Sequence, residues 1–392
     1  MTALLPTPDR ERTAPRRRLS LVEPTVVSPT LPSAPTVTID LDAVAANTRR
    51  LAEATTGELM AVVKADGFGL GAVELAQAAL SHGATRLGVT GFQEAARLRA
   101  AGITAPILTW LHAPDADYSL ARALDLEVAV PSIAHLAELV VTAPGTRVHL
   151  QLDTGLARDG AAPQTWRALF RQAANLERAG LVTVVGLMGH LPAADDLFGA
   201  SNATGRARLL GAQQLARRYG LRPQQCHLAA TDATLNDPLS HFTMSRCGAG
   251  IVGAAGGLRG VVTVTAPIVE IRRVPAGTPV GYGHTWIAPE ETTLALVPVG
   301  YADGLPRLAG ARASMLVGGE RRPVVGRISM DMTVIDLGSR RASLGDTVTI
   351  LGPGDAGEPT IQDWADWADT LPHEILTGLG SRLRRTYVGA GR

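Results

Sequence analysis

The stretch AVVKADGFGLG, residues 61–71, constrains the fold more than any other part of the chain. The apolar run Leu59–Val63 predicts a short buried strand, which ends at Lys64 because the three glycines within Gly67–Gly71 cannot continue it. A lysine at the mouth of a core strand is costly to desolvate, and neighbouring glycines let a backbone approach a ligand closely. The pattern suits a neutral, nucleophilic amine of the kind that forms a Schiff base. A lysine that extends from a strand end into water is the simpler interpretation of this stretch alone.

Similar apolar runs alternate with amphipathic segments as far as about Leu258. The other predicted strands are Arg86–Thr90, Pro106–Trp110, Leu126–Val130, Arg147–Asp153, Thr183–His190, Gln224–Ala229 and a last run near Ala249–Gly253. The predicted helices are Val73–Ser81, Gln93–Ala101, Ile133–Val141, Pro163–Ala179 and Ala207–Tyr219. Eight strands that alternate with helices predict an α/β fold of the (β/α)8 TIM-barrel type, with a six-stranded doubly wound sheet as the alternative topology.

The pattern changes after about residue 258. The later runs are short, rich in β-branched residues and separated by glycine, proline or charged turns; they are Val261–Val274, Thr292–Val299, Ala313–Val317, Arg322–Val325, Met332–Asp336 and Thr347–Leu351. No helical pattern appears among them before Ile361–Trp367. We therefore predict a (β/α)8 barrel over residues 35–258, followed by a C-terminal all-β domain over residues 259–392.

The first 34 residues differ from both of these parts. They contain six prolines and the basic cluster Arg16-Arg17-Arg18, without a periodic apolar face. The segment Leu19–Ser33 includes Glu23 and three prolines, so it lacks the apolar core of a signal peptide. We predict a disordered N-terminal tail over residues 1–34.

The composition argues against several classes of protein. With 392 residues, of which 46% are hydrophobic and 19% charged, the chain is long enough for two globular domains with a large core. A net charge of +1 gives no reason to expect nucleic acid or an anionic membrane as partner, and no apolar run reaches the roughly 18 residues of a membrane span. The two cysteines, Cys226 and Cys247, form neither a CxxC motif nor a disulfide framework, which fits a cytoplasmic protein.

Polar residues gather at the carboxyl ends of the predicted strands, where a barrel of this type carries its active site. They are Lys64, Asp153-Thr154-Gly155 with Arg158, His190, His227 with Thr231, and Arg246. Taken singly, each has an ordinary explanation as a core histidine, a solvated arginine or a β-turn. Their shared position at one rim of the barrel predicts a single site.

The chain resembles the alanine racemase family, enzymes that carry pyridoxal 5′-phosphate (PLP) on a barrel followed by a β domain. The resemblance extends from about Val37 to Tyr387 and is strongest where GYADG and SMD segments occur together with the lysine segment. The matching segments are Ile39-Asp40-Leu41 with Asn47, Val63–Gly69, Asp153–Arg158, Gly189-His190 with Ala194-Asp195, Arg246-Cys247-Gly248, Gly281-Tyr282-Gly283, Val299–Gly304 with Arg307, Gly326–Asp331, and Glu374 with Arg382, Arg385 and Tyr387.

The resemblance implies an amino-acid racemase that interconverts L-alanine and D-alanine and supplies D-alanine for peptidoglycan. PLP provides the electron sink, and two bases on opposite faces of the substrate exchange the α-proton. The resemblance assigns these catalytic roles to Lys64 and Tyr301, with the tyrosine coming from the partner subunit of a homodimer. No metal is implied.

The resemblance also implies roles for other residues. Arg246 is expected to face the pyridine nitrogen, where a permanent charge disfavours protonation of the ring. Decarboxylases of the same architecture carry a glutamate at that place, so Arg246 favours the racemase. The implied cofactor-binding residues are Lys64, Phe68, His190, Thr231, Arg246, Gly248 and His373; the substrate-binding residues are Arg158 and Met330; and the supporting residues are His227 and Asp331.

The chain departs from the family pattern at several of these positions. Phe68 and His373 stand where tyrosines are usual, Leu70 replaces a histidine, and Ala230-Thr231 replaces Asn-Ser. Gln151 takes the place of a lysine that is carbamylated in many members; its neutral amide can still hydrogen-bond Arg158 but cannot neutralise its charge. These departures bear on phosphate affinity and on the choice of substrate.

Two alternative functions therefore accompany the racemase hypothesis. One is a related PLP racemase that acts on serine or a basic amino acid. The other is a PLP-binding protein without turnover, although the single-domain proteins of that kind lack the β domain and the GYADG tyrosine present here.

Overall fold

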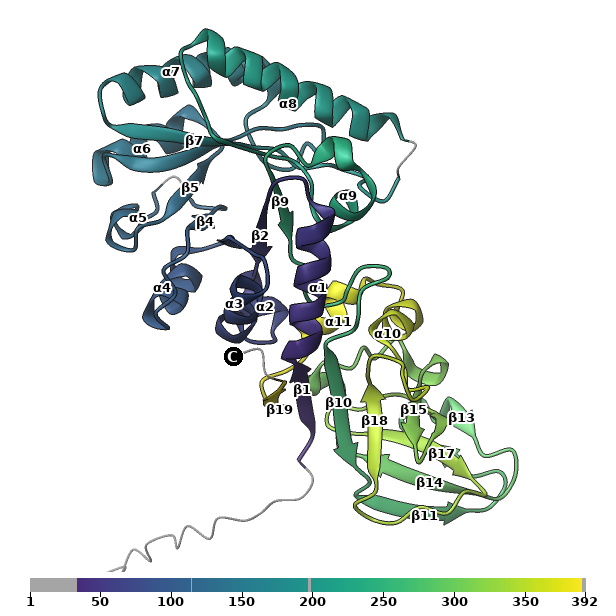
Figure 1. Ribbon diagram of the computed structural model, residues 1–392. Coiled ribbons are helices and arrows are strands. Elements are labelled where there is room, and N and C mark those ends of the chain that lie inside the picture. Colours follow the sequence, from purple (N-terminus) through teal and green to yellow (C-terminus); the bar gives the residue numbers. More distant parts are fainter. Residues whose placement is uncertain (1–33, 114, 197–198, 390–392) are drawn as a thin grey trace, which may run out of the picture. The chain divides into compact units, whose positions relative to one another are not determined.

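The computed structural model describes residues 34–113, 115–196 and 199–389. The tail predicted over residues 1–34 lies, except for its last residue, outside the described residues. Within them, eight parallel strands close into a barrel that helices surround (Figure 1). The barrel strands are β2 (Glu58–Val62), β3 (Arg86–Val89), β4 (Ile107–Thr109), β5 (Glu127–Val130), β6 (Thr146–Gln151), β7 (Val182–Met188), β8 (Gln225–His227) and β9 (Met244–Cys247).

Closure of the barrel excludes the doubly wound alternative. The first barrel strand, β2, pairs in parallel with the last, β9, with Met60 opposite Arg246 and Ala61 opposite Cys247. The predicted (β/α)8 fold is therefore confirmed. The helices of this part are α1 (Leu41–Ala54), α3 (Ala72–Ser81), α4 (Phe92–Ala100), α5 (Ser119–Ala123), α6 (Ile133–Thr142), α7 (Trp166–Arg178), α8 (Ala200–Arg218) and α9 (Thr231–Asn236).

The last barrel strand was predicted in the wrong place. It is β9, whereas the segment near Ala249–Gly253 forms turns in which the Ala254 N–H donates to the Ala249 carbonyl at 2.8 Å. The polar residues Ser245 and Arg246 interrupt the apolar run of the real strand, although both are buried in the protein interior. Ile251 and Val252 are buried as well, so their apolar character did not distinguish a strand from a packed turn.

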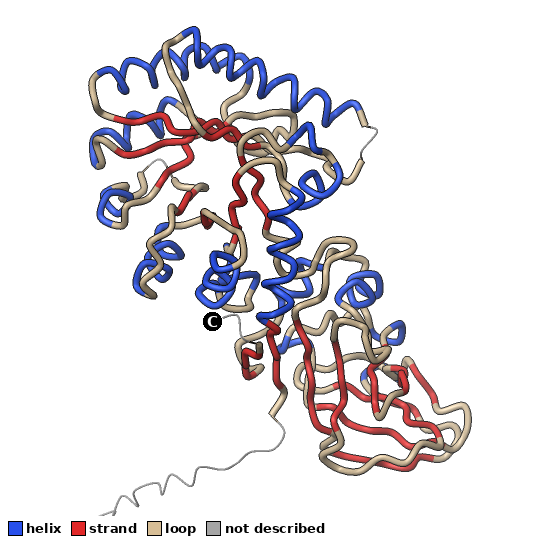
Figure 2. The backbone as a smooth tube through the Cα atoms, in the orientation of Figure 1, coloured by secondary structure: helices blue, strands red, loops and turns tan. Residues whose placement is uncertain are grey.

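The remaining strands form smaller sheets that few helices accompany (Figure 2). The single run predicted over Val261–Val274 is in fact two strands, β10 and β11, which belong to different sheets. A six-stranded sheet contains β16 (Glu320–Pro323), β15 (Ser314–Val317), β18 (Thr347–Leu351), β10 (Val262–Pro267), β1 (Thr36–Asp40) and β19 (Arg384–Val388), in that order. The other sheets contain β11 (Glu270–Val274), β14 (Thr292–Val297) and β17 (Thr333–Gly338), and the pair β12 (Pro279–Val280) and β13 (Trp286–Ile287); α10 (Ile361–Ala368) and α11 (Pro372–Gly378) follow.

Strand β1, which precedes the barrel in the sequence, belongs to the six-stranded sheet and not to the barrel. It pairs antiparallel with β10 and parallel with β19, so the residues that precede the barrel contribute to the six-stranded sheet. Helix α1 starts directly after β1, because the Asp40 carboxylate accepts hydrogen bonds from the N–H groups of Asp42 and Ala43 at 2.9 and 3.0 Å. The division into domains at residues 35–258 and 259–392 stays a prediction.

Two side chains of β19 hydrogen-bond to the turn that follows Lys64. The Arg385 guanidinium donates to the Gly69 carbonyl at 2.8 Å, and the Tyr387 hydroxyl donates to the Leu70 carbonyl at 3.0 Å. Residues more than 300 positions apart thus fix the backbone beside the lysine. Within the described part of the chain, no helix is both long and apolar enough to span a membrane.

Candidate active site

Lys64 lies at the carboxyl end of β2, at the start of an unusual turn. The five residues that follow it all adopt positive φ angles: Ala65 (53°), Asp66 (53°), Gly67 (63°), Phe68 (61°) and Gly69 (79°). Only glycine adopts this conformation without strain, so the three other residues cost about 1–3 kcal/mol each. Such strain is typical of functional sites, where the surrounding structure enforces it.

Glu94 and Asp66 enforce the strained turn. One Glu94 carboxylate oxygen accepts the Ala65 N–H at 2.6 Å, and the other accepts the Thr90 N–H at 2.9 Å. The Asp66 carboxylate accepts the Ala72 N–H at 3.2 Å, which links the turn to the first residue of α3. Glu94 was not predicted as a site residue, because it lies 30 residues after Lys64 on the next helix but one and no motif marks it.

Lys64 is also the only lysine in the chain; arginine accounts for every other residue among the 37 lysines and arginines. A guanidinium cannot lose its proton in a protein, whereas an ammonium can. The single position that keeps a lysine is therefore one where the chemistry needs an amine that can be deprotonated. This signal is present in the sequence and was missed there.

The surroundings of Lys64 favour the neutral amine. Burial lowers the pKa of the half-buried lysine most, the positive charges of Arg158 and Arg246 lower it further, and the Glu94 carboxylate opposes them in part. Arg158 and Arg246 thus lie within electrostatic range of the lysine, as predicted from their positions at strand ends.

Arg246 is buried, and three acceptors fix its guanidinium. One terminal nitrogen donates to His227 Nδ1 at 2.8 Å, and the other donates to the Gly189 carbonyl at 2.7 Å and to His190 Nδ1 at 3.2 Å. Burial lowers the pKa of Arg246 to about 10, so the side chain remains charged at neutral pH. Burial and then the charges of Arg246, Arg158 and Lys64 lower the pKa of His190 to about 3, which keeps its imidazole neutral. The structure therefore brings Lys64, Arg158, His190 and Arg246 together.

A chain of buried polar residues continues from His227 into the barrel. His227 Nε2 lies 2.9 Å from His149 Nδ1, and His149 Nε2 lies 2.9 Å from a Glu127 carboxylate oxygen. His149 and Glu127 were missed in the sequence. Glu127 begins β5 ahead of an apolar run, and His149 alternates with Arg147 and Gln151 along β6, so both are typical of surface residues.

The residues predicted to hold the cofactor phosphate form a tight cradle near Lys64. The Gly250 N–H donates to the Thr231 hydroxyl at 3.1 Å, and a Cβ added at Gly250 would lie 2.7 Å from the Thr231 methyl group. A Cβ added at Gly248 would lie 3.0 Å from the Phe68 ring and 3.1 Å from the Val62 carbonyl oxygen. These close contacts with protein atoms leave no room for a side chain at either glycine.

His373 completes this side of the site. Its ring centroid lies 6.0 Å from that of Phe68. Burial lowers the pKa of His373 most, the Asp232 carboxylate raises it in part, and the charge of Lys64 lowers it further. The Nδ1 atom of His373 is buried and, among the described residues, has no hydrogen-bond partner. A buried, unpaired imidazole nitrogen beside a glycine cradle and a lysine of lowered pKa fits a phosphorylated aldehyde such as PLP.

Gln151 makes no hydrogen bond with Arg158 among the described residues. Its amide nitrogen donates to the Asp159 carboxylate at 2.7 Å. Its buried amide oxygen, the only atom of the side chain that could accept from a guanidinium, has no partner among the described residues. The hydrogen bond that a neutral amide could make to Arg158 is therefore not formed.

Tyr301 and Met330 lie on two neighbouring loops, one after β14 and the other before β17. The Tyr301 N–H donates to the Ser329 carbonyl at 3.0 Å, and the Ala302 N–H donates to the Met330 carbonyl at 2.9 Å. Both side chains are exposed, Tyr301 to 40% and Met330 to 53%. Within the described residues, the Tyr301 hydroxyl has no hydrogen bond, so the structure does not bring it to Lys64 of the same chain.

Arg382 makes this pair of loops rigid. Its guanidinium donates to both carboxylate oxygens of Asp303 at 2.9 Å and to Asp331 at 2.7 Å, and Asp303 accepts the Gly300 N–H at 2.9 Å. The Arg307 guanidinium lies 5.8 Å from the centroid of the Tyr301 ring. Asp331, predicted as a supporting residue, therefore helps to fix the backbone around Tyr301.

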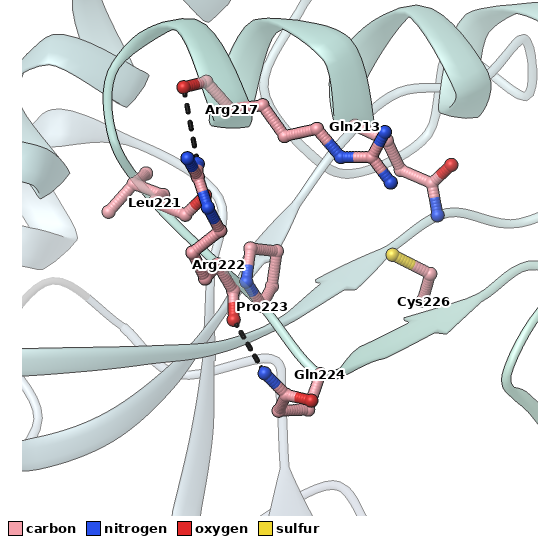
Figure 3. Close-up of a pocket in the computed structure, with 7 residues that line it drawn as sticks. All are labelled: Gln213, Arg217, Leu221, Arg222, Pro223, Gln224 and Cys226. Carbon is pink, nitrogen blue, oxygen red and sulfur yellow. Dashed lines mark hydrogen bonds between the residues drawn. The ribbon is translucent and has the colours of Figure 1, made fainter.

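A pocket elsewhere on the barrel contains none of the predicted site residues. It lies between α8 and β8 and is lined in part by Arg217, Arg222 and Cys226 (Figure 3). Since most of its lining precedes or begins β8, it lies at the amino ends of the barrel strands, away from Lys64.

The barrel is closed, and the lysine at one of its strand ends has a pKa that burial and two arginines lower. These features are typical of an enzyme that binds a carbonyl compound through an amine. The family models described as "Alanine racemase, N-terminal domain" and "Alanine racemase, C-terminal domain" match residues 39–256 and 261–387. The chain belongs to the alanine racemase family, a family of PLP-dependent enzymes, and the resemblance seen in the sequence is confirmed.

Individual relatives agree with this assignment. An alanine racemase of Frankia casuarinae is 43% identical over 366 residues, which cover 89% of this chain and 95% of the relative. The crystal structure of alanine racemase from D-cycloserine producing Streptomyces lavendulae is 39% identical, with a TM-score of 0.90 over 92% of this chain and 98% of that chain. A structure of alanine racemase from Bartonella henselae with covalently bound pyridoxal phosphate is 26% identical, with a TM-score of 0.83 over 91% of this chain and 100% of that chain.

The glycine cradle gives a direct test of the cofactor site. We expect Gly248→Ala to weaken PLP binding about tenfold, because an added methyl group would displace the Phe68 ring and overpacking typically costs about 1–3 kcal/mol. The matched control is Gly256→Ala, since nothing lies within 4 Å of a Cβ at that position. The dissociation constant of PLP, measured by absorbance titration of the apoprotein, checks the effect. Equal affinities of the two variants would contradict this placement of the cofactor.

Proposed function

We propose that this protein is an alanine racemase that binds PLP through Lys64 and interconverts L-alanine and D-alanine. The observation that supports it most is the pairing of the only lysine in the chain, its pKa lowered, with the buried, charged Arg246. PLP, when bound, withdraws electrons from the α-carbon of the amino acid and so makes its proton removable.

The residues on the PLP side of the site have separate tasks. Lys64 Nζ would hold the cofactor through its aldehyde group, and its amine would move a proton at one face of the α-carbon of the substrate. Arg246 would be the residue for the ring nitrogen; because a guanidinium has only donors, it would favour a ring nitrogen that carries no proton. Phe68, Thr231, Gly248 and His373 would hold the phosphate.

A second base has to act on the opposite face, and we assign this task to Tyr301. Its side chain is exposed, and among the described residues its hydroxyl has no hydrogen bond in its own chain, which supports an active site completed by a second copy of the chain. Met330 would then present its backbone N–H to the substrate carboxylate across the same interface. The functional unit in this proposal is a homodimer.

Arg158 binds the carboxylate of the amino acid or an oxygen of the cofactor in this proposal, and Asp159 with Gln151 restrains the backbone beside it. His227 supports Arg246, and Asp331 supports the Tyr301 loop. We further propose that the enzyme acts in the cytoplasm and supplies D-alanine for peptidoglycan.

Purified protein loaded with PLP tests the function directly. Incubation with a panel of L-amino acids, including alanine, serine and lysine, followed by chiral analysis of the products, should give D-alanine at the highest kcat/KM. If serine or a basic amino acid is racemised with a higher kcat/KM than alanine, that amino acid is the preferred substrate and the proposal of alanine is wrong. Binding of PLP without any D-amino acid would show that the protein has no racemase activity.

Mixing two inactive variants tests the shared site. Lys64→Ala removes the cofactor lysine, and Tyr301→Phe removes only the ionisable oxygen. A hybrid dimer holds one intact site, so a one-to-one mixture after subunit exchange should recover about a quarter of the wild-type activity. Mixing Lys64→Ala with the double variant is the matched control and should recover nothing. No recovery with proven subunit exchange would mean that Tyr301 acts within its own chain or not at all.

A further inference from the structure

In the buried series of hydrogen bonds that leads from Arg246 into the barrel, the donor and the acceptor of every bond can be assigned. Its members are contributed by four barrel strands, and all are at most 5% exposed: Arg246 (β9), His227 (β8), His149 (β6) and Glu127 (β5). Among the described residues, no carboxylate forms an ion pair with Arg246. A buried guanidinium without a carboxylate partner is costly unless its charge is balanced in another way.

The position of every proton in the chain follows from the donor at its start. Arg246 can only donate, so His227 Nδ1 has to accept, and the His227 proton must be on Nε2. His227 Nε2–H then donates to His149 Nδ1, which places the His149 proton on Nε2. His149 Nε2–H donates to Glu127, which ends the chain. Each bond therefore points from the guanidinium towards a carboxylate.

The carboxylate at the end is charged. Burial by itself would raise the pKa of Glu127, but the hydrogen bond from His149 and the charge and hydrogen bonds of the Arg86 guanidinium favour the carboxylate and lower the pKa. Arg86 donates to both Glu127 oxygens, at 3.0 and 3.1 Å. Two neutral imidazoles thus connect a buried positive charge with a buried negative charge across the barrel.

The barrel is shaped to admit this chain. The pairing of β6 with β7 shifts register between Val148 and His149, so that His149 lies opposite Gly186. A Cβ added at Gly186 would lie 2.0 Å from His149 Nδ1, so only glycine leaves room for the imidazole there. The irregular pairing and the glycine thus occur together where the barrel has to accommodate the His149 imidazole. Bulges of this kind are common near functional sites.

We propose that Glu127 and His149 are positioning residues of the active site, which act through His227 to hold the Arg246 guanidinium in a single orientation. The effect on catalysis rests on the proposed function, in which Arg246 faces the ring nitrogen of PLP. The arrangement of protons in the chain does not depend on that function, so the two can be tested separately.

The first test measures the protons in the full-length protein with its cofactor. Nitrogen NMR of a sample labelled at histidine should show His149 and His227 as neutral rings with the proton on Nε2. His241, which accepts the Thr56 N–H at Nδ1 and lies 2.9 Å from the Thr234 carbonyl at Nε2, is an internal reference for this tautomer. His82, whose Nδ1 lies 2.8 Å from the Ala78 carbonyl, is the reference for the opposite one. A His227 ring protonated at Nδ1 would overturn the proposal, even if the protein proves to be an active racemase.

The second test compares two substitutions that remove one carboxylate from the same arginine. Glu127→Gln removes the end of the chain, whereas Glu58→Gln removes the other partner of Arg86, at 2.5 Å, and leaves the chain intact. We expect Glu127→Gln to lower kcat about 3- to 30-fold with little change in KM, because Arg246 contacts the cofactor and not the substrate. Glu58→Gln should stay within about twofold of wild type. Equal losses of kcat in both variants would mean that Glu127 acts only structurally, through Arg86, and would contradict the proposal. If Glu127→Gln does not fold, the tautomers of His149 and His227 measured in the wild-type protein decide whether the proposal holds.

Discussion

A permanently charged guanidinium inside the barrel is the constraint on which the rest of the site depends. Arg246 is held by His227, His190 and the Gly189 carbonyl, and in the described residues it has no carboxylate in contact. Together with burial and the charge of Arg158, its charge lowers the pKa of both Lys64 and His190 and so favours the neutral amine and the neutral imidazole.

The fold could be predicted where hydrophobic periodicity alone decides it. Alternating buried strands and helices give the barrel, and short β-branched runs give the later sheets. The exceptions have a common cause: β9 contains Ser245 and Arg246, which are buried by tertiary partners that a local pattern cannot reveal. The place of β1 could not be predicted either, because its partners, β10 and β19, lie more than 200 and 300 residues further along the chain.

The site could be predicted where chemistry and strand position coincide. Lys64, Arg158, His190 and Arg246 are polar residues at strand ends, and the structure brings them together. His149 and Glu127 could not be found in this way, because a buried polar residue within a strand has meaning only through partners on other strands. The hydrogen bond from the Gln151 amide nitrogen to Asp159 could not be predicted either, because it depends on the turn that follows β6. Tyr301 remains beyond a single chain, since its proposed partner site belongs to a second copy.

The central claim is that the only lysine in the chain holds the cofactor, and chemical trapping tests it most directly. Purified enzyme loaded with PLP is reduced with borohydride, digested and mapped by mass spectrometry. The account predicts one pyridoxyl group per chain, on the peptide that contains Lys64, and none after substitution by arginine, whose guanidinium stays protonated. Trapping at the α-amino group of the chain, or bound cofactor that borohydride does not attach, would contradict it.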